Sequence, residues 1–145
     1  MADAERFSSN ESTLTLAQRR RKRFSLIEAN RTLPLVRRIA ADVVRTQADA
    51  RVLHKQLTRK LSRADRQALS VELDTVVNRL QGFVEELTDV GVELKDYQSG
   101  LLDFVSIHQG REVYLCWKLG EDRIAHWHEL DAGFQGRQPV SVLQQ

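Results

Sequence analysis

The sequence predicts an α+β fold in which a long antiparallel helical hairpin, resembling a coiled coil, is followed by a small antiparallel β-meander packed on it. Two observations support this prediction. Residues 33–90 hold two long runs with coiled-coil spacing of apolar side chains, whereas residues 91–136 hold six of the seven glycines, both tryptophans and the single cysteine. We therefore interpret the first half as a scaffold and expect any chemistry or recognition in the second.

A capping pattern marks the start of the helical region. Ser25 and Glu28 have the spacing of a capping box, which predicts a short helix there. Pro34 suits the first turn of a new helix, where its missing N–H costs nothing. We predict this helix over residues 33–60. Its apolar seam alternates between spacings of three and four residues, through Val36, Ile39, Val43, Thr46, Ala50, Leu53 and Leu57.

A second helix is predicted over residues 63–90, because Ser62 has the chemistry of an N-cap and Gly91 that of a C-cap. The connection between the two helices is short, so they should be antiparallel neighbours. The same seam spacing continues in this helix through Leu69, Leu73, Val76, Leu80, Phe83, Leu87 and Val90.

Charge is unevenly distributed along the chain. Residues 24–60 carry eight basic and three acidic side chains, and residues 61–90 carry three basic and six acidic ones. This favours pairing of the two helices and leaves a basic surface only at the front of the chain. The basic run consists of Arg19, Arg20, Arg21, Lys22 and Arg23. It would contact phosphates of a nucleic acid without sequence specificity, or else be a solvated tail.

Glycines near every tenth position indicate the β-meander, predicted over residues 91–130. The β-prone segments between them are Val92–Asp96, Leu101–Ile107, Arg111–Lys118 and Arg123–Glu129. One domain spans residues 24–138, between a disordered basic tail (1–23) and a flexible C-terminus (139–145). No apolar run approaches the roughly 20 residues that cross a bilayer, and the single cysteine cannot form an internal disulfide. We expect a cytoplasmic protein without membrane contact.

Turn lengths decide which side chains share a face of the sheet. A tight turn at Gly120-Glu121 would place Leu115 opposite His126. A three-residue turn at His108–Gly110 would place Asp103 beside Leu115. Asp103 would then share a face with the two histidines of the His-x-His segment, and Cys116 would point away from them.

This arrangement suggests a divalent metal site formed by Asp103, His126, His128 and Glu129. Two imidazoles at positions i and i+2 of a strand face the same way, and a carboxylate would complete a His₂-carboxylate set. The alternative is that the histidines are partly buried and hydrogen-bonded. Cys116 is interpreted as a buried structural thiol rather than a nucleophile.

Other side chains in the second half have two interpretations. Trp117 and Trp127 would contact a ligand or partner, or would join the sheet to the helices. Lys95, Asp96 and Arg137 lie beside glycine-rich turns, where they would bind a ligand or hold a loop by ion pairing. The residue pattern alone does not separate these interpretations.

Several segments of the chain resemble segments of one protein family. These segments are Phe24, Glu28-Ala29-Asn30, Leu33-Pro34, Lys95-Asp96, Gly100–Phe104, Gly110–Glu121, Trp127-His128-Glu129 and Gly133–Arg137. Over residues 24–138 the chain resembles the short bacterial proteins grouped as domain of unknown function 2203. The resemblance implies a bacterial cytoplasmic domain and transfers no activity. In that family an aromatic side chain mainly stands at the position of His126, which favours a site built from Asp103, His128 and Glu129.

The function expected from these observations is a non-enzymatic interaction module that forms homo-oligomers along the hairpin or the sheet edge, with a protein partner that the sequence does not identify. No phosphate-binding loop, nucleophile elbow or paired-cysteine zinc pattern is present in the sequence. The sequence also allows two alternatives. One is a metal-binding protein or metal-dependent hydrolase, and the other is a nucleic-acid or ribosome-associated factor acting through the basic tail and first helix.

Overall fold

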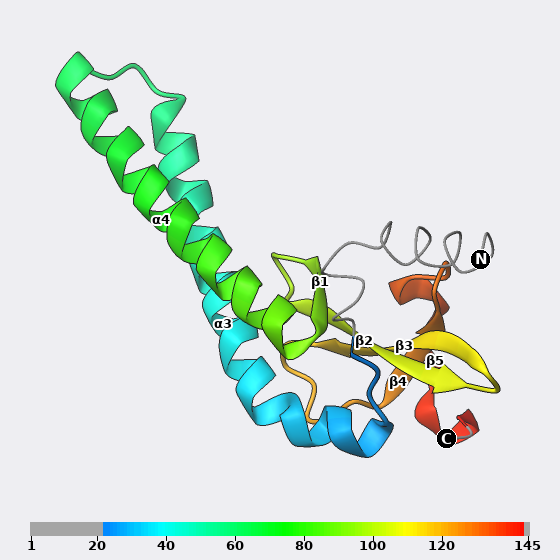
Figure 1. The fold of residues 1–145 in the computed structure, drawn as a ribbon. Helices are drawn as coiled ribbons and strands as arrows, with labels where there is room; N and C mark the ends of the chain where they lie inside the picture. The colour runs from blue at the N-terminus through cyan, green and yellow to red at the C-terminus, as the bar shows by residue number, and fades with distance from the viewer. Residues whose placement is uncertain (1–21, 144–145) are drawn as a thin grey trace, which may run out of the picture.

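The computed structural model describes residues 22–143 and confirms the predicted α+β class. Two antiparallel helices form a long hairpin that projects from a small sheet (Figure 1). The helices are α3 (Leu26–Leu57) and α4 (Arg63–Val90). The strands are β1 (Val92–Asp96), β2 (Leu101–His108), β3 (Arg111–Lys118), β4 (His126–Glu129) and β5 (Gln138–Pro139), with short 3-10 helices η1 (Phe134–Gly136) and η2 (Val140–Val142).

The helix ends follow the predicted local chemistry. Ser25 Oγ accepts the N–H of Glu28 at 3.1 Å, and Glu28 Oε1 accepts the N–H of Ser25, so the capping box is complete. Ser62 Oγ caps α4 by accepting the N–H of Asp65 at 3.1 Å. Gly91 ends α4 with φ +98°, a conformation that glycine adopts without steric cost.

The prediction that Pro34 begins a new helix is wrong. Pro34 lies inside α3, which runs unbroken for 32 residues. A proline there removes one intrahelical hydrogen bond and crowds the preceding turn. Leu33 and Val36, however, are 3% and 0% exposed against the core, while Pro34 itself faces outward. Tertiary packing on both sides of the proline therefore outweighs its local preference.

The five strands form one antiparallel sheet in the order β1-β2-β3-β4-β5. Four of these strands correspond to the predicted segments, although β2 continues one residue further to His108, and β5 was not predicted. The fourth strand is shorter than expected, because β4 begins at His126 rather than at Arg123. Residues before it are held by α3: the Ile124 N–H donates to Asn30 Oδ1 at 2.9 Å, and Arg37 donates to the Asp122 carbonyl at 2.7 Å.

Both predicted turns are wrong by one residue. His108 pairs with Arg111 through a two-residue turn at Gln109-Gly110, where φ is +51° and +76°. Positive φ at both central residues is the type I′ geometry that matches strand twist. Asp103 therefore lies opposite Cys116 rather than Leu115.

The connection from β3 to β4 also shifts the strand register by one residue, because Cys116, rather than the predicted Leu115, pairs with His126. The two errors cancel for Asp103, His126 and His128, which share one face of the sheet as predicted. The same errors placed Cys116 on the wrong face, because it lies with these residues.

The helices cover the opposite face of the sheet. The core there joins the inner side of the hairpin to strand residues that are almost fully buried, including Leu102, Phe104, Leu115 and Trp117, each 0% exposed. Only the part of the hairpin next to the sheet takes part. Beyond Thr46 in α3 and before Leu80 in α4, Leu53 is the sole buried helical residue. We call this outer part, residues 47–79, the distal hairpin.

Candidate functional site

A cluster of three different polar side chains lies on the sheet face away from the helices. Asp103 comes from β2, Cys116 from β3 and His128 from β4, which are adjacent strands. Their exposed fractions are 2%, 0% and 2%. One ligand atom from each, a carboxylate oxygen, the thiol sulfur and a ring nitrogen, lies within 4.8 Å of the other two. We call these three residues the buried cluster.

Hydrogen bonds fix the orientation of the histidine in this cluster. His128 Nδ1 lies 2.7 Å from the Glu129 carbonyl oxygen, which can only accept, so Nδ1 carries a proton. His128 Nε2 then points at the carboxyl group of Asp103, 3.0 Å from Oδ1 and 3.1 Å from Oδ2. At these distances Nε2 and the carboxyl group of Asp103 are within hydrogen-bond reach of each other.

Burial changes the acid–base properties of the other two groups. Loss of solvent raises the pKa of Asp103 above its usual value, and the contact with His128 only partly opposes this. Burial, assisted by the charge of Asp103, also raises the pKa of the Cys116 thiol to about 12. The thiol is therefore neutral in this arrangement, unlike the exposed thiolates that act as nucleophiles.

Two of the four predicted metal ligands lie elsewhere. The His126 ring shares the face, but its Nδ1 is 3.8 Å from Glu121 Oε2 and its side chain is 38% exposed. Glu129 belongs to the opposite face, because it pairs with Val113, and its carboxylate forms an ion pair with Arg111. The structure brings Asp103 and His128 together and adds Cys116. A two-residue turn at Gln109-Gly110 is the sequence signal that would have placed Cys116 opposite Asp103.

Lys95 lies near the buried cluster. Its Nζ is 3.1 Å from Glu93 Oε1 and 4.6 Å from the centre of the Tyr114 ring, while Tyr114 donates to the same Glu93 oxygen at 3.0 Å. Asp96 instead stabilises the following turn by accepting the Ser99 hydroxyl at 2.5 Å and the Ser99 N–H at 2.9 Å. These hydrogen bonds lower the pKa of the Asp96 carboxyl group.

The two tryptophans and Arg137 are held inside the fold. Trp117 is 0% exposed and donates from Nε1 to the Glu121 carbonyl at 3.0 Å. Trp127 is 3% exposed and packs against the His108 ring, with centroids 5.1 Å apart. Arg137 donates to both carboxylate oxygens of Glu121 at 2.8 Å. This ion pair connects the segment after β3 to the segment after η1.

Most of the basic run, Arg19, Arg20 and Arg21, lies outside the described residues. Lys22 Nζ approaches Glu28 at 4.0 Å and the centre of the Phe24 ring at 4.8 Å. Arg23 donates to Glu112 at 3.1 Å. Contact of this run with nucleic acid stays a prediction, and steeply salt-dependent binding that requires residues 1–23 would be its signature.

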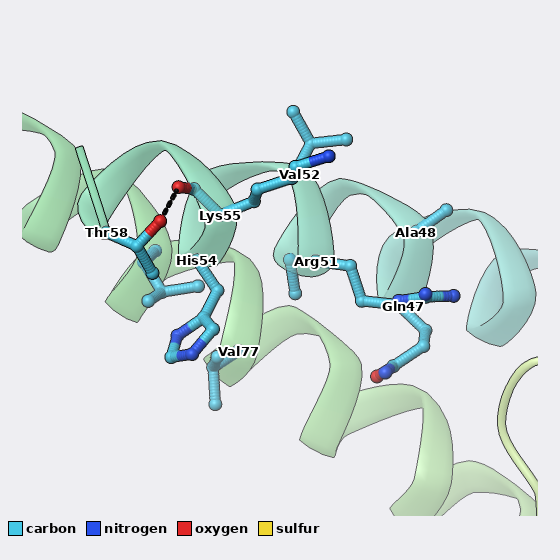
Figure 2. Close-up of a pocket in the computed structure, with 10 residues that line it drawn as sticks. Gln47, Ala48, Arg51, Val52, His54, Lys55, Thr58 and Val77 are labelled. Atoms are coloured by element: carbon cyan, nitrogen blue, oxygen red, sulfur yellow. Dashed lines mark hydrogen bonds between the residues drawn. The ribbon is translucent and has the colours of Figure 1, made fainter.

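A second feature is a groove of about 840 Å³ on the distal hairpin. Figure 2 shows His54 extending from α3 toward Val77 of α4, whereas Val52 points away from α4. The lining combines apolar and basic side chains and includes no carboxylate. It consists of Gln47, Ala48, Ala50, Arg51, Val52, His54, Lys55, Thr58, Leu73 and Val77.

A helical hairpin with a five-stranded antiparallel sheet and an Asp-Cys-His cluster defines the structural class of this protein. By sequence, the chain belongs to the family of uncharacterized conserved proteins DUF2203, whose model matches residues 22–140. Comparison with curated proteins and with solved structures gives no match. Within residues 22–143, neither helix is long and apolar enough to cross a membrane.

Proposed function

We propose that the protein is a non-enzymatic interaction module that self-associates through its distal hairpin. The observation that carries this proposal is the incomplete burial of the distal seam. Leu69, Leu73 and Val76 continue the apolar pattern of α4 but are only half-buried. Val52 and Val71 are 57% and 55% exposed. Covering such side chains contributes about 25 cal/mol per Å² of apolar surface removed from water.

A second copy of the same chain is the occupant that the charges favour. Helix α3 carries six basic and three acidic side chains, whereas α4 carries three basic and six acidic ones. A two-fold axis between two hairpins can place α3 of each copy against α4 of the other. The basic and acidic helices then face each other twice, which favours this pairing over a contact between like helices.

The groove fits the same partner. Leu73, Val77 and Ala50 provide apolar surface, and Arg51 and Lys55 add positive charge. An amphipathic acidic helix such as α4 matches both properties. A cytoplasmic location is part of the proposal, since Cys116 is a free thiol and reducing compartments keep thiols free.

Sedimentation equilibrium of the full chain over a range of concentrations tests this function. We expect a dimer whose dissociation constant rises at least about tenfold in Val52→Glu, equivalent to about 1.4 kcal/mol, because the new charge would be desolvated in the contact. Ile27→Glu is the matched control, since Ile27 is a 65% exposed apolar residue of α3 outside the groove. A monomer at all concentrations, or equal weakening by both variants, would contradict the proposal.

A further inference from the structure

We propose that Asp103, Cys116 and His128 form a binding site for one transition-metal cation of the zinc type. This inference is independent of self-association, because the buried cluster lies on the sheet and the distal hairpin does not contribute to it. It also differs from the ligand set expected from the sequence, since Cys116 takes the place of His126 and Glu129.

The spacing of the ligand atoms suits a cation. Zinc binds sulfur at about 2.3 Å and nitrogen or oxygen at about 2.0–2.2 Å, so the ligand atoms of a tetrahedral site lie about 3.3–3.6 Å apart. The carboxylate oxygen, sulfur and ring nitrogen of the buried cluster already lie within 4.8 Å of one another. Small side-chain rotations on three hydrogen-bonded strands would therefore complete the site without a change of fold.

The hydrogen bond of His128 to the backbone gives an independent reason. Donation from Nδ1 to the Glu129 carbonyl leaves Nε2 as the nitrogen directed at Asp103 and Cys116. Metal-binding histidines usually donate their other ring N–H to a carbonyl or carboxylate, which fixes the tautomer and orients the ring. His126 has no such bond, because its Nδ1 is buried without a hydrogen-bond partner among the described residues.

Electrostatics also favour a cation at this position. A carboxyl group and a thiol are costly to ionise away from water unless a positive charge lies beside them. A bound divalent cation would supply that charge and deprotonate the thiol that it ligates. Without that cation, Lys95 and Arg137 offset only part of the cost of ionising Asp103 and Cys116.

The donor set indicates which class of cation would bind. Thiolate and imidazole ligands favour zinc and related transition metals, whereas magnesium and calcium prefer sites made of oxygen atoms only. Three protein ligands leave one position of a tetrahedral cation for a small ligand. With all three residues at 2% exposure or less, the site suits retention of the ion within the fold.

Cobalt(II) titration of the tag-free full chain, after removal of metal with a chelator, tests this site. We expect a thiolate-to-cobalt charge-transfer absorption that saturates at one cobalt per chain and disappears when zinc is added. Cys116→Ser should remove this absorption, and His128→Gln should weaken cobalt binding at least about tenfold. His126→Gln is the matched control, because the same substitution on the same strand leaves the buried cluster intact and should retain wild-type binding.

Three results would overturn the proposal. The first is a wild-type protein without charge-transfer absorption at saturating cobalt. The second is unchanged absorption in Cys116→Ser. The third is loss of binding in His126→Gln equal to that in His128→Gln, which would indicate a His-x-His site instead. Circular dichroism checks the folding of each variant. If His128→Gln fails to fold, the wild-type cobalt spectrum and Cys116→Ser decide the question.

Discussion

The sheet and the distal hairpin use apolar residues of similar type but bury them to different extents. Strands β2 and β3 contain two continuous buried runs, residues 102–106 and 113–117. Helix α4 buries only Leu80 and Leu87 in 28 residues. The strands lie in the middle of the sheet, whereas the distal helices, within residues 22–143, pack mainly on each other. A regular apolar pattern therefore determines where an element can pack, and burial depends on how many layers surround it.

The largest expected difference is between a buried ion pair of the sheet and an exposed ion pair of helix α3. Asp103→Ala should destabilise the metal-free protein by about 3–5 kcal/mol, because it leaves His128 buried without its partner. Asp42→Ala removes the partner of Arg45, an ion pair on the hairpin in which Arg45 is 70% exposed. We expect a loss of at most about 1 kcal/mol there. Urea unfolding with chelator present measures the loss of unfolding free energy in both variants. Equal losses would contradict the expected difference between the buried and the exposed ion pair.

Matched leucine truncations should give the next largest difference. Leu115 is 0% exposed in the centre of the sheet, whereas Leu73 is half-buried in α4. We expect Leu115→Ala to reduce the free energy of unfolding by about 2–5 kcal/mol and Leu73→Ala by about 1 kcal/mol. Both variants should be compared at one low protein concentration, because dimer formation stabilises the folded chain. A larger effect at Leu73 would mean that the distal seam is already closed in the monomer.

Two glycine-to-alanine substitutions should have opposite signs. Gly100 has φ +70°, and an added Cβ would lie 2.9 Å from Leu119 Cβ, so Gly100→Ala should destabilise by about 1–2 kcal/mol. Gly82 lies in α4, and an added Cβ would meet no atom within 4 Å. Gly82→Ala should therefore stabilise the protein by about 0.5–1 kcal/mol. Thermal unfolding of the two variants gives the signs directly, and a shared sign would refute this interpretation.

Features set by a few neighbouring residues were predictable from the sequence. The caps at Ser25 and Ser62 and the helix end at Gly91 follow from local hydrogen bonding and backbone freedom, and the structure confirms each. The first four strands follow from glycine spacing in the same way. Pro34 is the exception. Leu33 and Val36 beside it pack against core residues far along the chain, and this packing overrides the local preference of proline.

Features set by single-residue register or by distant contacts were not predictable. The membership of the buried cluster depends on two turn lengths, and an error of one residue in each moved Cys116 to the other face. The start of β4 depends on a hydrogen bond from Ile124 to Asn30, 94 residues earlier in the chain. The pattern of neighbouring residues in the sequence carries no information about a contact between such distant residues.

Amide hydrogen exchange at two protein concentrations tests the contrast between the two regions most directly. One concentration should lie below and the other above the dimer dissociation constant measured by sedimentation. We predict that amides of residues 47–79 exchange more slowly at the higher concentration, because a second copy then covers the distal hairpin. Amides of β2 and β3 should exchange equally slowly at both concentrations. Equal exchange of residues 47–79 at the two concentrations would contradict the view that a second copy completes the hairpin.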